Sequence, residues 1–193
     1  MIAKALQILR PYKIPFRRQM RRSAVAIIYR DHPSRGRELF FIERARRPGD
    51  PWSGDMAFPG GKMHSDDVSI CATAKRETRE ETGIDLDQSA HYEGRLRDVL
   101  TRRHNQFRPM VVTPHLFRLM EEPLLELNHE VAGVLWVPLA FLDDPANLST
   151  TPWRMRGVSL KMPCYYFEDK CIWGLSFQML QDLRASGRLK AGR

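Results

Sequence analysis

The sequence contains little cysteine and no long apolar run. Its 193 residues include three cysteines, which form no C-x-x-C pair, so we expect neither a disulfide framework nor a zinc site. No stretch of 18 consecutive apolar residues is present, and we therefore expect no membrane-spanning segment. Together these absences favour a reducing, cytoplasmic setting.

Acidic residues are missing from residues 1–22, which hold seven basic residues. The whole chain carries a net charge of +8, so residues 23–193 contribute only +1. Because apolar residues and prolines lie among these basic residues, we predict a basic extension that packs on the domain or on a second subunit, which leaves a homodimer open. The alternatives are a mitochondrial presequence, which would place the protein in mitochondria, and an arm for nucleic acid or a membrane, neither of which we expect as a partner.

Residues 23–193 are predicted to form one domain, and the apolar content of 42% suits a chain of this size. Strands are expected over residues 23–30, 38–44, 55–58, 94–100, 109–119 and 134–139, a hairpin over 165–173, helices over 67–82 and from 174 onward, and a loop over 143–157. This order of elements predicts an α/β fold, an α/β/α sandwich with a mixed β-sheet.

The helix expected over residues 67–82 carries three glutamates on one face. At 100° per residue, Glu77, Glu80 and Glu81 lie within an arc of about 100°. Ile70 and Ala74 fall on the same side, so this face starts apolar and ends in carboxylates. We therefore predict that the glutamates point toward a core and share one site.

Three carboxylates directed at a core repel each other and lose water, which a divalent cation would offset. Oxygen ligands favour a hard ion, Mg²⁺ or Mn²⁺. Arg76 stands four residues before Glu80, and we expect it to hold that carboxylate by a forked hydrogen bond. Gly60 and Gly61 allow close backbone approach, so a carbonyl at Gly61 is a further candidate metal ligand. Gly83 fits the position that ends the helix.

These residues resemble the Nudix box, G-x5-E-x7-R-E-U-x-E-E-x-G-U, where U is apolar. The match holds from Arg76 onward except that Thr78 replaces an apolar residue. Asp67 stands at the first glutamate position, and the stretch before Arg76 is one residue longer than the pattern. Both departures are similar to the coenzyme A pyrophosphatase branch of the family.

The segment before the box also resembles that branch, whose pattern there is G-x-V-x-F-P-G-G. Residues 54–61 fit it, with Met56 in place of valine. Ala45 stands where serine is usual and His64 where aspartate is common. These departures bear on the substrate and not on the chemistry.

The resemblance implies a Nudix pyrophosphohydrolase that cleaves a diphosphate linkage in a nucleoside diphosphate derivative with Mg²⁺ or Mn²⁺. The branch implies coenzyme A or acyl-coenzyme A as the small-molecule substrate, giving 3′,5′-ADP and (acyl-)4′-phosphopantetheine. The alternatives are ADP-ribose, NADH, a nucleoside diphosphate sugar, a dinucleotide or a nucleoside triphosphate as substrate, or a non-catalytic nucleotide-binding regulator.

The candidate site residues follow from the box and its flanks. The expected catalytic residues are Arg76, Glu77, Glu80, Glu81 and Glu130, the metal ligands Gly61, Glu77, Glu80 and Glu81, and the substrate-binding residues Arg44, Arg46, Arg47, Arg102 and His104. For Glu130 two interpretations stay open. It reaches the metals or acts as general base, or it is a surface residue at the start of a strand.

Overall fold

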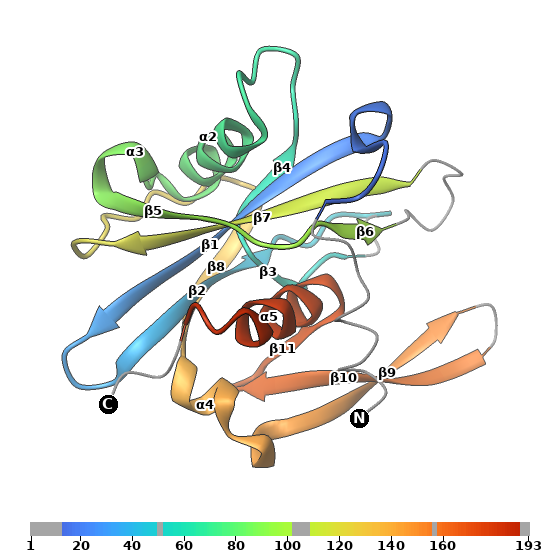
Figure 1. The fold of residues 1–193 in the computed structure, drawn as a ribbon. Coiled ribbons are helices and arrows are strands. Elements are labelled where there is room, and N and C mark those ends of the chain that lie inside the picture. The colour runs from blue at the N-terminus through green and yellow to red at the C-terminus, as the bar shows by residue number, and fades with distance from the viewer. Residues whose placement is uncertain (1–12, 50–51, 102–108, 156–157, 190–193) are drawn as a thin grey trace.

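The computed structural model describes residues 13–49, 52–101, 109–155 and 158–189, and its elements form two sheets with helices around them (Figure 1). The larger sheet contains β1 (Arg21–His32), β2 (Gly36–Arg44), β3 (Met56–Ala57), β4 (Gly60–Lys62), β5 (Ala90–Arg95), β6 (Val99–Thr101), β7 (Met110–Leu119) and β8 (Val131–Pro138). The smaller sheet contains β9 (Leu148–Met155), β10 (Val158–Phe167) and β11 (Lys170–Trp173). The helices are α2 (Ile70–Thr82), α3 (Leu86–Ser89), α4 (Leu139–Asp143) and α5 (Gly174–Ser186), with 3-10 turns η1 (Arg17–Gln19) and η2 (Pro145–Asn147).

Strand β1 is the centre of the larger sheet. It pairs in parallel with β7 and antiparallel with β2 and β4, which makes the sheet mixed. Helices α2 and α3 cover one face, and α4, α5 and the smaller sheet cover the other (Figure 1). The predicted α/β/α sandwich with a mixed sheet is therefore confirmed, as is the hairpin of β1 and β2. Within the described residues, no helix has both the length and the apolar content that a bilayer crossing requires.

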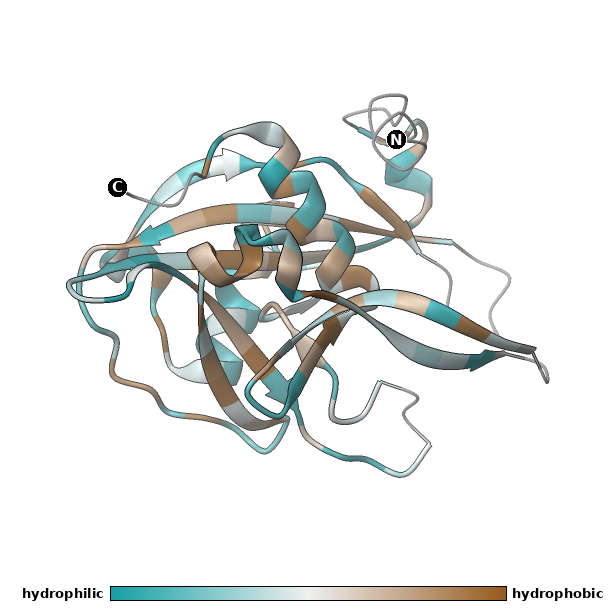
Figure 2. Cartoon of the chain, turned by 90° about the horizontal axis from the view of Figure 1, so that it is seen from below, coloured by the Kyte–Doolittle hydropathy of each residue, from teal (hydrophilic) through white to brown (hydrophobic). Residues whose placement is uncertain are grey.

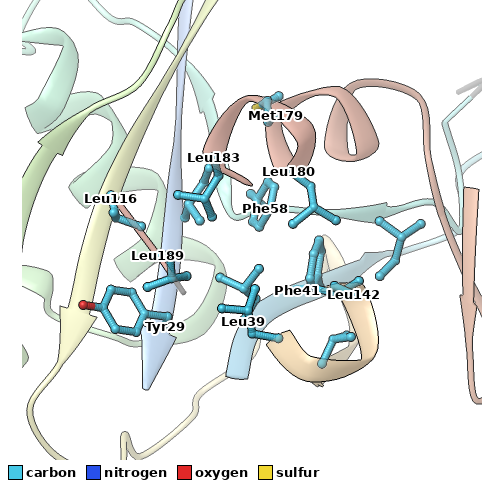
Figure 3. Close-up of a cluster of buried hydrophobic side chains, with 14 of the residues drawn as sticks. Tyr29, Leu39, Phe41, Phe58, Leu116, Leu142, Met179, Leu180, Leu183 and Leu189 are labelled. Carbon is cyan, nitrogen blue, oxygen red and sulfur yellow. The ribbon is translucent and has the colours of Figure 1, made fainter. Parts of the chain in front are cut away.

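A separate apolar core lies on each face of the larger sheet. On the α5 side, Met179, Leu180 and Leu183 pack toward Leu39 and Phe41 of β2 (Figure 3). Each fully buried leucine contributes roughly 1.5–3 kcal/mol relative to an exposed one. The apolar stripe expected on this helix is therefore core.

On the other side, α2 lies against small residues of β1. Ala24 and Ala26 are fully buried there beside Ala74 of the helix, with Ile28 farther along the strand. Small side chains on both elements allow the helix backbone to approach the sheet closely. This close packing positions the glutamates of α2 next to β4 and the start of β1.

The loop predicted over residues 143–157 is wrong, because β9 occupies most of it. Strand β9 pairs antiparallel with β10, and the distal end of this pair, around Arg154 and Ser159, extends away from the rest of the molecule (Figures 1 and 2). From Thr151 to Arg154 the side chains alternate only between half-buried and exposed, so no apolar alternation marks the strand. Pro152 also indicates a loop, yet it is tolerated because β9 is an edge strand.

The strand predicted over residues 94–100 is two strands, β5 and β6, with a buried carboxylate between them. Asp98 accepts hydrogen bonds from the Nη2 of Arg95 at 2.6 Å and the Oγ1 of Thr113 at 2.8 Å. These donors offset the cost of burying the carboxylate at the break between the two strands.

The described part of the basic N-terminal segment, from Lys13 onward, contacts the same carboxylate. The backbone N of Ile14 donates to Asp98 Oδ2 at 3.1 Å, and the Nη2 of Arg17 donates to Thr113 at 2.8 Å. The first strand begins at Arg21, so this segment leads directly into the sheet. Residues 1–12 lie outside the described residues, and the boundary at residue 22 stays a prediction.

His115 on β7 is a buried histidine near these charges. Its Nδ1 lies 3.0 Å from the hydroxyl of Tyr92, and its buried Nε2 has no hydrogen-bond partner in the part of the chain that the structure describes. Burial, together with the positive charges of Arg95 and Arg17, lowers the pKa of His115 to about 4 from 6.5. The folded protein therefore disfavours the protonated ring.

We predict that this histidine destabilises the protein in acid. A lowered folded-state pKa means that its contribution is complete above pH 6.5 and is lost as pH falls toward 4. At about pH 5 the loss should be about 2 kcal/mol. Urea unfolding of the wild type and His115→Gln at about pH 7.5 and 5 measures it, because the variant lacks this titration. An equal loss in both proteins would contradict the prediction.

Candidate active site

Helix α2 has defined signals at both ends. The side chain of Ser69 accepts a hydrogen bond from Ala72 N at 3.0 Å, and Gly83 ends the helix in the left-handed conformation at φ 78°. The helix therefore starts at Ile70, and Asp67 lies in the loop before it. The position predicted for Gly83 is confirmed.

The three glutamates of α2 differ in burial. Glu81 is 4% exposed and accepts a hydrogen bond from the backbone N of Gly60 at 2.8 Å. The side chain of Glu77 is 17% exposed, whereas that of Glu80 is 54% exposed. The prediction that all three point toward a core holds for Glu81 and Glu77 and is wrong for Glu80, which lies at the edge of the helix face.

Burial controls the electrostatics of the two inner carboxylates. The pKa of Glu81 is raised to about 8, mainly by burial and also by the charge of Glu77, while the Gly60 hydrogen bond and Arg44 act against this rise. Burial also raises the pKa of Glu77. Two adjacent carboxyl groups that resist ionisation form a place where a cation would be stabilised.

Arg76 connects these carboxylates to the loop before the helix. Its forked pair of hydrogen bonds goes to Asp67, with Nε to Oδ1 at 2.9 Å and Nη2 to Oδ2 at 3.1 Å. Its Nη1 donates to Glu80 at 3.0 Å, and its Nη2 lies 2.9 Å from Glu77. The forked bond expected on Glu80 is therefore wrong, because Asp67 presents both of its oxygens to the same edge of the guanidinium.

Asp67 is held in place from three directions. Besides Arg76, the backbone N of His64 donates to it at 2.8 Å and the hydroxyl of Thr73 at 2.9 Å. The Arg76 guanidinium holds the pKa of the Asp67 carboxyl well below its usual range. The sequence indicated the position of Asp67 within the box but not this role as the anchor of Arg76.

Gly60 and Gly61 bring β4 into direct contact with β1 and α2. Gly60 has φ 150°, and a Cβ there would lie 2.6 Å from the Cα of Val25. At Gly61 a Cβ would lie 2.6 Å from Oε1 of Glu77. The backbone of β4 therefore lies immediately beside the carboxylates because neither residue has a side chain.

Ser23 is a site residue that sequence reasoning missed. It pairs across from Lys62, and its hydroxyl donates a hydrogen bond to the carbonyl of Gly61. Along β1, residues 25, 27 and 29 on the same face are apolar, so a serine at the start of this row was the available signal. Its hydroxyl fixes the direction of the Gly61 carbonyl.

The donor set suits a hard divalent cation. The carboxylate of Glu77 lies beside the backbone of Gly61 and that of Glu81 beside Gly60, so both carboxylates and the backbone carbonyl of Gly61 are available as oxygen ligands on adjoining residues. Among the described residues, no three acidic, histidine or cysteine side chains are gathered as a complete metal-binding set. Arg76 instead supplies positive charge to Glu77 and Glu80.

The predicted substrate-binding arginines differ in which acidic residue they lie near. Arg44 ends β2 near Glu81, whose pKa its charge lowers, and its backbone bonds to Asp55 and Gly54 at 3.1 and 2.9 Å. The Nη2 of Arg47 instead pairs with Glu130 at 3.2 Å.

Arg46 lies by Gly54, with its Nε 3.7 Å from where a Cβ of that residue would be. Arg102 and His104 lie outside the described residues. Of the predicted arginines that the structure describes, Arg44 is therefore the one whose charge acts on Glu81.

Glu130 lies just before β8. Its carbonyl accepts a hydrogen bond from Ala45 at 2.7 Å, and its charge raises the pKa of Glu81. Its side chain is 43% exposed and pairs with Arg47. This placement keeps Glu130 within electrostatic range of the site.

The two glycines of β4 give a matched test of this geometry. We predict that Gly60→Ala destabilises the fold strongly, because its methyl group meets the backbone of β1. Gly61→Ala should keep the fold, because the atoms nearest its methyl group belong to the flexible end of Glu77, and should weaken Mn²⁺ binding by displacing that carboxylate. Thermal unfolding and Mn²⁺ titration separate the two effects. Unchanged Mn²⁺ affinity in a folded Gly61→Ala variant would contradict the arrangement.

Two known proteins share sequence with this chain. The chain is 42% identical over 107 residues to an uncharacterized protein of Schizosaccharomyces pombe, covering 54% of this chain and 32% of that protein. It is 28% identical over 132 residues to an uncharacterized Nudix hydrolase, NudL, of Yersinia pestis, covering 68% of this chain and 63% of that protein. The chain thus spans less than two thirds of the length of both relatives.

The fold is shared with a solved Nudix hydrolase from Mycobacterium smegmatis, RenU. The TM-score is 0.58 at 16% sequence identity, over 88% of this chain and 89% of that one. The sequence profile of the NUDIX domain matches residues 20–156, which include β1, the glycine pair of β4, α2 and Glu130. The chain therefore belongs to the Nudix family.

Proposed function

We propose that this protein hydrolyses a diphosphate linkage in a nucleoside diphosphate derivative with the help of Mg²⁺ or Mn²⁺. The observation that carries the proposal is the buried carboxylate of Glu81, which lies beside Glu77 and next to the Gly61 backbone. An apolar residue would pack at this buried position better than a carboxylate does. A cation site explains why it is there.

Glu81, Glu77 and the Gly61 carbonyl would hold the divalent ion, and Glu80 adds negative charge at its exposed side. When bound, the ion supplies charge neutralisation of a diphosphate and lowers the pKa of an attacking water. The protein contributes fixed ligands, because Gly60 holds Glu81 and Ser23 holds Gly61. Arg76 is a positioning residue that keeps Glu77 and Glu80 oriented from the loop of Asp67.

Glu130 is the candidate for accepting a proton from the attacking water. It lies in electrostatic range of Glu81, and its exposed side chain can reach solvent. The contact with Arg47 at 3.2 Å holds this carboxylate beside the site, and a general base must lie within reach of the proton that it accepts. If Glu130 is instead a surface residue at the start of β8, another group acts as the general base.

Coenzyme A and its acyl derivatives are the substrates that we propose first. They combine a diphosphate with a 3′-phosphate, and the site combines carboxylates with basic residues. Backbone hydrogen bonds join Arg44 to Asp55 and Gly54, so the segment over residues 54–61 that resembles the coenzyme A branch runs directly beside this arginine. The expected products are 3′,5′-ADP and (acyl-)4′-phosphopantetheine.

A nucleotide without a 3′-phosphate, such as ADP-ribose, is the second candidate. The charge of Arg47 is already neutralised by Glu130, which leaves fewer cations for an additional phosphate. Ala45 and His64 also depart from the pattern of the coenzyme A branch. A non-catalytic regulator fits less well, since Glu77, Glu80 and Glu81 are all present.

The first prediction concerns Glu81→Gln. Its kcat should fall about a hundredfold or more at saturating Mg²⁺, because a metal-binding charge is lost. Without metal the variant should be more stable, by at most about 4 kcal/mol at pH 8, because a raised pKa means that ionised Glu81 weakens the wild-type fold as pH rises above 4.5.

Glu121→Gln, a change in the exposed segment after β7, is the matched control and should alter neither quantity. Turnover is measured with Mg²⁺, and urea unfolding is measured in a chelator. Near-wild-type turnover of Glu81→Gln would remove this residue from the metal site.

The second prediction tests the substrate. If Arg46 reads the 3′-phosphate, Arg46→Ala should lower kcat/KM for coenzyme A far more than for 3′-dephospho-coenzyme A, because only the former carries the additional charge. Arg118→Ala, on β7, is the control. Cleavage of ADP-ribose or a nucleoside triphosphate with about a hundredfold higher kcat/KM than coenzyme A would assign the protein to another substrate.

A further inference from the structure

Cys164 and Cys171 face each other across the hairpin of β10 and β11. The turn contains Glu168, with φ 53°, and Asp169, between the paired residues Phe167 and Lys170. The two residues that flank a two-residue turn form a hydrogen-bonded pair. Along antiparallel strands, hydrogen-bonded pairs alternate with non-hydrogen-bonded pairs. The pairs of Cys171 with Tyr166 and of Cys164 with Trp173 are therefore the non-hydrogen-bonded ones, where side chains approach most closely.

The two thiols occupy one diagonal of these neighbouring pairs. Each residue of the first strand has a directly paired partner on the second strand. The right-handed twist of a hairpin brings the residue closer to the one that comes two positions before that partner in the sequence. Cys164 is paired with Trp173, so Cys171 stands at this position. Both side chains therefore lie on the same face of the hairpin, and burial together with the neighbouring Cys171 raises the pKa of Cys164 to about 11.

Their surroundings give them different access to solvent. Cys164 is fully buried, whereas Cys171 is half-buried. The third cysteine, Cys71, lies on α2 against the other face of the larger sheet and is remote from both. The hairpin therefore holds a shielded thiol and an accessible one side by side.

We propose that Cys164 and Cys171 are a dithiol site that hydrogen peroxide oxidises to a disulfide within the hairpin. The sulfur of Cys171 attacks one peroxide oxygen, the O–O bond breaks, and Cys171 becomes a sulfenic acid while one water leaves. The sulfur of Cys164 then attacks that of Cys171, the S–S bond forms, and the second water leaves with the proton of Cys164. Two thiols lose two electrons in total, and one peroxide is reduced to two waters.

The hairpin is joined to the candidate active site at two points. The indole Nε1 of Trp173 donates to Asp55 at 2.9 Å, and the Nζ of Lys170 pairs with Glu43 at 3.1 Å. Asp55 and Glu43 flank the contact between Arg44 and the segment that leads to Gly60. A disulfide here would tie β11, which carries both contacts, to β10.

The test counts thiols before and after oxidation of the reduced full-length protein with hydrogen peroxide. Alkylation under denaturing conditions, with intact mass and peptide mapping, should show that only one of the three thiols of the wild type remains. The mass should fall by about 2 Da, and the mapped bond should join Cys164 to Cys171. Cys71→Ser should lose both of its thiols in the same way.

Cys171→Ser is the decisive variant, because its half-buried position tolerates the change, and it should form no intramolecular disulfide. Cys164→Ala removes the buried thiol of the pair and should likewise form no intramolecular disulfide. Retention of all three thiols in the oxidised wild type would overturn the proposal. Disulfide-linked dimers, or a bond that includes Cys71, would overturn it as well.

Discussion

The structure depends most on the burial of one carboxylate, that of Glu81. Its charge resists removal from water, and the single backbone hydrogen bond from Gly60 does not compensate for it. The residues around Glu81 accommodate this buried charge. Gly60 and Gly61 have no side chains, so that β4 can reach the carboxylates, and Arg76 supplies positive charge beside Glu77.

Strand β1 relates this site to the rest of the fold. At its start it pairs with the glycines of β4, and Ser23 fixes the Gly61 carbonyl. Farther along, it places small residues against α2 and large ones against α5, so two cores hold the same strand rigidly. This strand gives the site a rigid base, and Arg76, anchored by Asp67, orients the carboxylates of α2 that lie against it.

The sequence predicted the structural features that depend on local periodicity. It did not predict those that depend on contacts between residues far apart in the chain. The apolar stripe of α5, the hairpin of β1 and β2 and the end of α2 at Gly83 follow from neighbouring residues, and all three are confirmed. Asp67 as the partner of Arg76 depends on how a loop folds back over the helix, which spacing does not reveal. Strand β9 was not predicted because its residues 148–154, whose burial the structure describes, show no buried apolar face.

The central claim, a cation between α2 and β4, is tested most directly by a crystal structure grown with Mn²⁺ and recorded for anomalous scattering. The account predicts an anomalous peak bounded by the carboxylates of Glu77 and Glu81 and the carbonyl of Gly61. It also predicts that Arg76 keeps its forked bond to Asp67. Saturating Mn²⁺ that leaves this place without a peak, or binds only elsewhere, would contradict it.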